Sequence, residues 1–139
     1  MNERERGSTA VFVVLFSVAM FALAGLLVDG GAAMNARLRA ADIAEQGARA
    51  GADTIDEDEL RSSGKIVIRN EGEACGRAGR IVSAHAEAAA VMNSCQVSGG
   101  NQVTVSIQIK WDAFLLTVLG IKGGTMSATI TAGPQTGVG

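Results

Sequence analysis

The sequence predicts an α+β protein: one long N-terminal helix, first transmembrane and then amphipathic, followed by a small, mostly antiparallel three-stranded sheet with one packed helix. Three observations predict this class. Gly7–Val28 contains no charged residue, the segment after it is rich in alanine without proline, and two later segments alternate apolar and polar residues. At 139 residues, the chain is long enough for one modest domain and not for two.

The stretch Gly7–Val28 reads GSTAVFVVLFSVAMFALAGLLV, and we assign the transmembrane helix to residues 8–28 and a charged leader to residues 1–7. As a helix, these 22 positions would span roughly 33 Å, slightly more than the hydrocarbon core of a bilayer. A cleaved secretory signal is the competing interpretation, but the apolar part of a signal is normally shorter. The lipid bilayer is therefore the first partner that the sequence indicates.

Charge and cysteine content predict the orientation of this single-pass protein. Arg4 and Arg6 precede the span, and acidic residues count for little in the positive-inside rule, so the N-terminus is expected in the cytoplasm. Cys75 and Cys95 are the only cysteines, and a pair is what one disulfide requires. Because such a bond persists outside the cytoplasm, the C-terminal domain is expected there. Two unrelated buried thiols are the alternative interpretation.

The helix is expected to continue over residues 29–53. Ala32–Ala52 is rich in Ala, Arg, Glu and Leu and shows no strand-like alternation. Alanine recurs at every fourth position, which creates a stripe of small side chains that another backbone can approach closely: Ala36, Ala40, Ala44, Ala48 and Ala52. The helix should end near Asp53, because negative charge is unfavourable at a helix C-terminus.

An acidic linker is assigned to residues 54–64. Five acidic residues lie within Asp53–Glu59, and Asp56 with Glu59 has the pattern that caps a short helical turn. The run lacks the alternating ligands and the central glycine of a calcium loop. We therefore predict a solvated acidic turn.

Residues 65–134 are assigned to the small α+β domain and residues 135–139 to a flexible tail. Its elements are expected in this order: a strand at Lys65–Arg69, a helix at Glu73–Met92, a strand at Gln102–Trp111, a brief apolar helix or loop at Ala113–Gly120, and a strand at Thr125–Ala132. The helix should bury one face, made of Ile81, Ala84, Ala88 and Val91. The two later strands should each bury one face: Val103, Val105, Ile107, Ile109 and Trp111 in the first, and Met126, Ala128, Ile130 and Ala132 in the second.

The sequence predicts no catalytic residues, no metal site and no cofactor. His85 is the only histidine, and Ser83 and Glu87 are each two residues from it, so on a helix they face different directions. Two cysteines and one histidine are too few for a structural zinc site. A net charge of −2 and an aromatic content of 4% argue against nucleic acid as a partner.

Three stretches carry a family resemblance: Gly7-Ser8-Thr9 at the start of the apolar run, LLVDGG at Leu26–Gly31, and the alanine-rich segment from Ala36 to Ala52. Together they resemble the TadE/TadG-like family of the bacterial Flp (tight-adherence) pilus machinery, of the minor pilin or pseudopilin type. The resemblance covers Arg6–Ala52, a little over a third of the chain. It implies a structural, non-enzymatic accessory subunit that is anchored in the bacterial cell membrane.

The resemblance also implies partners and a processing site. The implied partners are other pilus or pseudopilus subunits and Tad assembly proteins, and the alanine stripe is expected to pack against such subunits. A prepilin peptidase, as a further partner, would cut between Gly7 and Ser8. Phe12 stands where pilins usually carry the glutamate that neutralises the new N-terminus, which favours a TadG-type protein that keeps its leader.

Two functions from other classes remain as alternatives. The first is a membrane-tethered extracytoplasmic ligand-binding or sensor domain unrelated to pili, which a well-formed pocket in the C-terminal domain would favour. The second is a membrane-anchored hydrolase, which requires catalytic side chains that converge in space.

Overall fold

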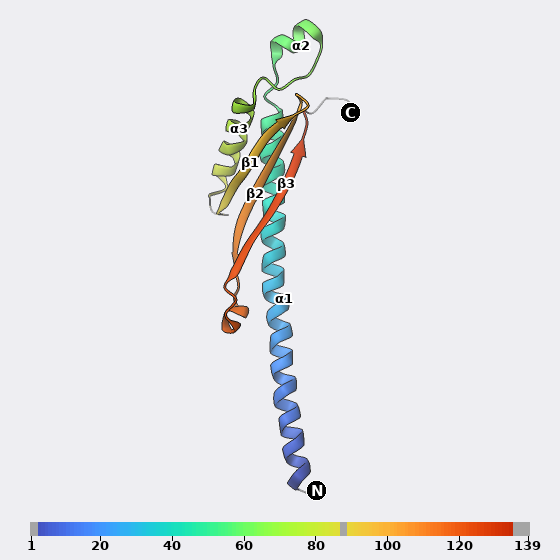
Figure 1. Cartoon of the computed structure of the whole chain (residues 1–139), viewed down its shortest axis with the longest axis vertical. Coiled ribbons are helices and arrows are strands. Elements are labelled where there is room, and N and C mark those ends of the chain that lie inside the picture. Colours follow the sequence, from blue (N-terminus) through green and yellow to red (C-terminus); the bar gives the residue numbers. More distant parts are fainter. Residues whose placement is uncertain (1–2, 87–88, 135–139) are drawn as a thin grey trace.

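The computed structural model describes residues 3–86 and 89–134. Its elements are α1 (Glu3–Ala52), α2 (Glu57–Ser63), α3 (Glu71–Ala84), β1 (Ala90–Ser98), β2 (Gln102–Asp112), the 3₁₀ helix η2 (Leu116–Leu119) and β3 (Gly123–Ala132). Helix α1 has 50 residues, a length of roughly 75 Å. The sheet and α3 pack along its C-terminal half, the turn that carries η2 lies beside its middle, and its N-terminal end projects beyond the domain (Figure 1). This arrangement confirms the predicted α+β class.

The acidic segment after α1 folds as a short helix. Helix α1 ends at Ala52, where the Thr54 hydroxyl donates a hydrogen bond of 2.6 Å to the carbonyl oxygen of Gly51. The Asp56 carboxylate then caps α2 by accepting hydrogen bonds from the backbone N–H groups of Asp58 and Glu59. Helix α2 lies at the end of the domain farthest from the N-terminus of α1 (Figure 1).

The sheet is antiparallel with the strand order β1-β2-β3, so β2 is the central strand. The predicted strands at Gln102–Trp111 and Thr125–Ala132 are confirmed as β2 and β3. Their register places Val105 between Cys95 of β1 and Ile130 of β3. On β2, the predicted inward face is buried at Val103, Val105, Ile107 and Ile109, and Trp111 at the strand end is half-buried.

The predicted strand at Lys65–Arg69 is wrong. Within it, Ile68 forms only an isolated bridge with Ile55. Two backbone hydrogen bonds, from Asp56 to Val67 and from Arg69 to Thr54, make this bridge with the segment after α1, and the N–H of Ile68 donates to Gly100 in the turn between β1 and β2. Because the pairing with residues 54–56 is limited to one bridge, and the sheet consists of β1, β2 and β3, the segment lies at the end of the sheet instead of extending it.

The predicted helix at Glu73–Met92 is also wrong in its second half, because α3 ends at Ala84 and residues from Ala90 onward form the edge strand β1. Pairing with β2 overrides the helix propensity of this alanine-rich segment. The expected helix face is corrected accordingly. The buried residues of α3 are Ala74, Ala78 and Val82, whereas Ala84 and Val91 are exposed, Ile81 is half-buried, and Ala88 lies outside the described residues.

The core lies between α1, α3 and the inner face of the sheet. Ala40, Ala44, Ala48 and Ala52 of the stripe are 0% exposed, and Ala36 is nearly as buried. They belong to the same cluster as the inward side chains of β2 and the buried face of α3. The stripe therefore packs within the chain, and the expectation that it packs against neighbouring subunits is wrong. Small side chains at this seam let a helix and a sheet approach closely without leaving voids.

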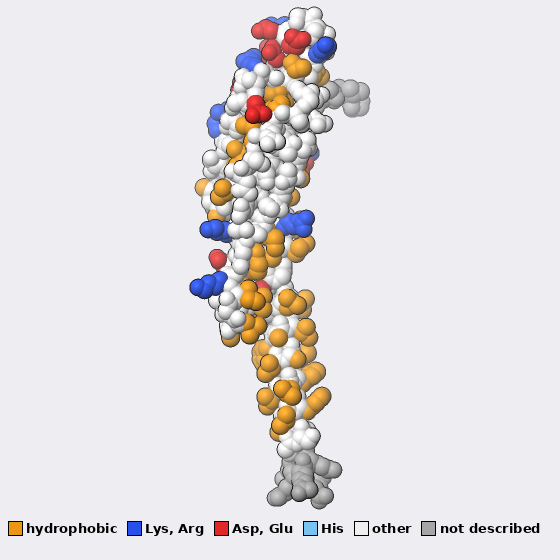
Figure 2. All heavy atoms as spheres, in the orientation of Figure 1, with side chains coloured by type: hydrophobic (Ala, Val, Ile, Leu, Met, Phe, Trp, Pro, Cys, Tyr) orange, Lys and Arg blue, Asp and Glu red, His pale blue; other side chains and the backbone are white. Residues whose placement is uncertain are grey.

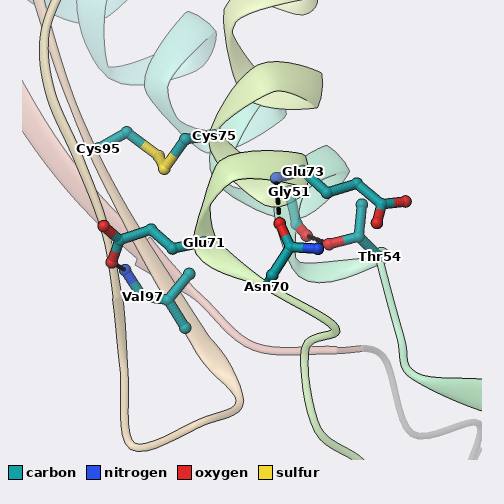
Figure 3. Close-up of a disulfide and its surroundings, with 8 residues drawn as sticks. All are labelled: Gly51, Thr54, Asn70, Glu71, Glu73, Cys75, Cys95 and Val97. Atoms are coloured by element: carbon teal, nitrogen blue, oxygen red, sulfur yellow. Dashed lines mark hydrogen bonds between the residues drawn. A yellow bond between two sulfur atoms is a disulfide. The ribbon is translucent and has the colours of Figure 1, made fainter.

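Helix α3 is tied to the edge strand β1 at its N-terminal end (Figure 3). Cys75 and Cys95 form a disulfide with a Cα–Cα distance of 5.7 Å. The Glu71 carboxylate accepts a 3.0 Å hydrogen bond from the backbone N–H of Val97, and Asn70 caps the helix by accepting one from the N–H of Glu73. These links hold α3 against the sheet although β1 is an edge strand.

Candidate membrane-facing site

The N-terminal half of α1 presents an apolar surface on all sides. Its large side chains are all exposed between Val11 and Val28, and Leu27 is 79% exposed. Among the described residues, α1 is the helix that is long and apolar enough to cross a membrane, and only 6% of its most apolar window is buried. Figure 2 shows this surface below the domain, where hydrophobic side chains cover the projecting helix. A surface of this kind is stable in lipid rather than in water.

A second apolar surface lies on the loop that joins β2 to β3, at residues 113–122. Val118 is 87% exposed, and Phe114, Leu119 and Ile121 are exposed as well. The loop folds back along α1, and the two enclose a groove of about 370 Å³. Only apolar residues line this groove: Val18, Phe21, Ala22, Ala24, Leu115, Leu116, Val118 and Leu119.

The close approach of this loop to α1 depends on Gly25. A Cβ atom at this position would lie 3.2 Å from the Cβ of Leu115, tighter than most real contacts. Gly25 is buried, in contrast to its exposed neighbours in the apolar run. The glycine therefore creates the space into which the loop packs.

Asp29 fastens the loop to the helix. One carboxylate oxygen, Oδ1, accepts hydrogen bonds from the backbone N–H groups of Phe114 at 2.8 Å and Leu115 at 3.3 Å. The other, Oδ2, accepts one from the N–H of Leu116 at 2.6 Å. These are the N–H groups at the start of η2, which have no partner within a helix. Although Asp29 is only 1% exposed, the three donors stabilise its charged form.

The loop also satisfies several of its own polar groups. The Thr117 hydroxyl donates to the carbonyl oxygens of Ala113 and Phe114, at 2.7 and 2.9 Å. Backbone N–H groups of Val118, Gly120 and Ile121 donate to carbonyl oxygens within the loop. Gly120 ends η2 with a φ of 85°, the left-handed conformation that glycine adopts most readily. The loop is thus a closed unit with apolar side chains outside.

Sequence reasoning predicted the brief apolar helix or loop at Ala113–Gly120 but not its contact with α1. Asp29 entered only as part of the LLVDGG stretch. A usable signal was present: a lone acid directly after an apolar run needs either water or donors, and a second uncharged apolar run follows at 113–121. Gly7 and Ser8 lie exposed within α1, and the bond between them stays the candidate site at which a prepilin peptidase would cut.

Those of the remaining candidates that the structure describes do not converge into a site. His85 Nε2 lies 3.2 Å from Gln46 Oε1, and the Ser83 hydroxyl donates to the carbonyl oxygen of Gly79. Glu87 lies outside the described residues. Within residues 3–86 and 89–134, no group of three or more His, Cys, Asp or Glu side chains could hold a metal ion. One groove of about 290 Å³ in the domain runs beside the Glu45–Arg49 ion pair and the end of β3.

Comparison with known protein families finds a match to the pilus-assembly family whose description reads "Putative Flp pilus-assembly TadE/G-like", over residues 7–54. The matched segment holds the apolar half of α1, Asp29 and the alanine stripe. The resemblance expected from the sequence is confirmed over these residues. No curated protein and no solved structure matches the chain.

Proposed function

We propose that this chain, whose residues 7–54 are TadE/G-like, is a membrane-anchored accessory subunit of a Tad/Flp-type pilus assembly system, of the minor pilin or pseudopilin type. The observation that carries the proposal is that the segment matched to the family is the same segment that contains the exposed apolar part of the helix. The matched segment includes the exposed apolar half of α1, which projects from the folded domain as an anchor or a packing element. Its role is structural and needs no catalysis.

The proposed orientation in the bacterial cell membrane is a cytoplasmic N-terminus with the domain outside. The disulfide between Cys75 and Cys95 supports it, because such bonds persist in oxidising compartments. The basic residues Arg4 and Arg6 ahead of the span support the same direction.

Subunit contacts must use surfaces other than the alanine stripe, because the domain already covers the stripe. The apolar half of α1 is one candidate, since helices associate in lipid by close packing of their side chains. The outer face of the sheet is another. It carries hydroxyl and amide pairs across the strands, such as Thr104 with Thr131 at 2.8 Å and Asn93 with Gln108 at 3.0 Å.

Site-specific cross-linking in cells that assemble Flp pili tests this proposal. A photo-reactive amino acid replaces Leu27, which is exposed on the apolar half of α1, and a matched control carries it at Ser62, exposed on α2 at the opposite end. We expect Leu27 to capture pilus subunits or Tad assembly proteins in the membrane fraction. Capture of neither class from Leu27, with the protein intact and membrane-bound, contradicts a role in the pilus system.

N-terminal sequencing of the membrane-extracted protein tests the leader. Phe12 cannot neutralise a new N-terminus as a glutamate would, so we expect the chain to start at Met1 or Asn2. A chain that starts at Ser8 instead identifies a prepilin peptidase as a partner and places this protein with the processed pilins.

A further inference from the structure

We propose that the β2–β3 loop, residues 113–122, is a second membrane contact, whose apolar side chains enter the same leaflet as the C-terminal end of the transmembrane helix. The occupant of the groove between loop and helix is then a lipid acyl chain. The inference rests on the membrane anchoring by α1 that the proposed function includes, and it adds a lipid-binding element to the folded domain.

The position of the loop along α1 carries the argument. The groove is lined on its helix side by residues from Val18 to Ala24, and Leu115 packs against Gly25. These helix residues, including Gly25, all lie within the span assigned to residues 8–28. At 1.5 Å per residue, Val18 is about 15 Å below Val28 along the helix axis. A bilayer that covers this part of the helix therefore also meets the loop beside it.

The chemistry of the loop suits hydrocarbon. Residues 113–121 carry no charge, and the exposed side chains of Phe114, Val118, Leu119 and Ile121 are apolar. Backbone polar groups in lipid must find partners within the protein. Here the N–H groups of residues 114–116 reach Asp29, those of residues 118, 120 and 121 reach loop carbonyls, and that of Ala113 reaches Lys122.

Charged residues lie at both ends of the loop, where the chain passes from the loop into β2 and β3. Asp112 and Lys122 bracket the uncharged run, and Lys110 lies on the adjoining end of β2. Figure 2 shows Lys or Arg side chains directly above the apolar part of the molecule. Trp111 lies at the same end of β2, and tryptophan is enriched at membrane–water interfaces. This order of apolar and charged residues places the lipid headgroups at the ends of β2 and β3 that adjoin the loop.

The loop also protects the charge on Asp29. A carboxylate one residue beyond an apolar span would face the bilayer interface, where an unpaired buried charge is costly. The loop covers Asp29 and supplies three donors to it. Helix and loop therefore form one membrane-embedded unit with the carboxylate enclosed.

Depth-dependent quenching in nanodiscs that hold one copy of the full chain tests the inference. Val118→Cys adds one free thiol to the chain, whose own cysteines are joined in the disulfide, and this thiol carries an environment-sensitive fluorophore. The quencher is phosphatidylcholine spin-labelled on its acyl chain. Leu15→Cys, in the span, is the positive control, and Ser62→Cys, on α2, is the negative control. All three positions are exposed, and equal unfolding temperatures before labelling verify that each variant folds. We expect the probes at 118 and 15 to lose most of their fluorescence and the probe at 62 to keep it.

The controls separate the possible failures. Quenching at 15 without quenching at 118 overturns this inference and leaves the anchoring by α1 intact. Quenching at neither position overturns the anchoring itself. The same labelled variant is also placed in vesicles that hold many copies of the chain. If the probe at 118 stays exposed to water in single-copy nanodiscs and is buried from water only in these vesicles, a second copy of the chain occupies the groove and the lipid assignment is wrong.

Discussion

At the level of single residues, Asp29 links two segments that are 85 residues apart in the sequence. Its carboxylate is buried and accepts three backbone hydrogen bonds from the start of η2. Hydrogen bonds to a charged acceptor are stronger than neutral ones, and their loss leaves unpaired N–H groups in an apolar setting. The position of the whole loop therefore depends on one side chain.

Asp29→Ala should destabilise the domain by on the order of 3 kcal/mol, because the N–H groups of Phe114, Leu115 and Leu116 lose their acceptor. Asp29→Asn should have a smaller effect, since its amide oxygen can still accept. Thermal unfolding in detergent, followed by the fluorescence of Trp111, measures this loss. Asp53→Ala, at an exposed acid beyond α1, serves as the control and should change little. Equal unfolding temperatures for Asp29→Ala and the wild type would show that the carboxylate does not hold the loop.

Two glycines of α1 offer a matched pair at the contact with α3. A Cβ atom at Gly51 would lie 2.9 Å from the backbone carbonyl oxygen of Ala74, whereas at Gly47 the nearest atoms are 3.7 Å away. Gly51→Ala should therefore destabilise the fold by about 1–3 kcal/mol through overpacking. Gly47→Ala should be neutral or stabilise it by up to about 1 kcal/mol through helix propensity. Urea unfolding separates the two, and equal effects would contradict the assigned packing.

At the level of elements, contacts with α3 hold the edge strand β1 in its register. Strand β1 pairs with β2 on one side only, and its register shifts between Met92 and Ser94. The disulfide from Cys75 to Cys95, together with the hydrogen bond from Val97 to Glu71, compensates for the missing neighbour. An edge strand that is held in this way is protected from slipping and from pairing with other chains.

Removal of the disulfide by the double change Cys75→Ser and Cys95→Ser should lower the free energy of unfolding by about 3 kcal/mol, for a loop closed across 20 residues. The expected fold is unchanged, because the core beneath the disulfide consists of alanine and β-branched side chains. Urea unfolding of the double variant and the wild type measures the difference. An unchanged midpoint, with the wild-type bond shown to be formed, would contradict a stabilising role.

At the level of the whole molecule, the two halves of α1 have different surroundings. Its N-terminal half is exposed and apolar, and its C-terminal half contributes buried residues, from Ala33 onward, to the domain core. The boundary between the two halves lies at Asp29, where the β2–β3 loop is attached. Because the helix is continuous, the domain is held at a set distance from the anchor.

A variant that lacks residues 1–28 should lose membrane attachment and keep its fold, because the core begins at Ala33. The full chain should stay in the membrane pellet after alkaline carbonate extraction, whereas the shortened variant should appear in the supernatant. Circular dichroism of the shortened variant checks that sheet and helix signals persist. A full chain that is released by carbonate would contradict anchoring by α1.

Features that depend on local sequence patterns could be predicted. The length of the apolar run and the lack of strand-like alternation after it predicted the long helix, and the alternation at Gln102–Trp111 and Thr125–Ala132 predicted two of the three strands. The alanine stripe was recognised as a packing surface but assigned to the wrong partner. Strand β1 was missed, because its alanine-rich start and the irregularity at Met92–Ser94 conceal the period of two.

By itself, the sequence determined that the chain has an apolar span, a helix that continues beyond it and two alternating strands, because hydrophobic periodicity is a local property. Only the tertiary structure decided that the stripe is covered by the chain's own sheet, that β1 completes this sheet, and that Asp29 receives the β2–β3 loop. These features join residues far apart in the sequence. They depend on close packing and on the pairing of buried polar groups, which no single segment encodes.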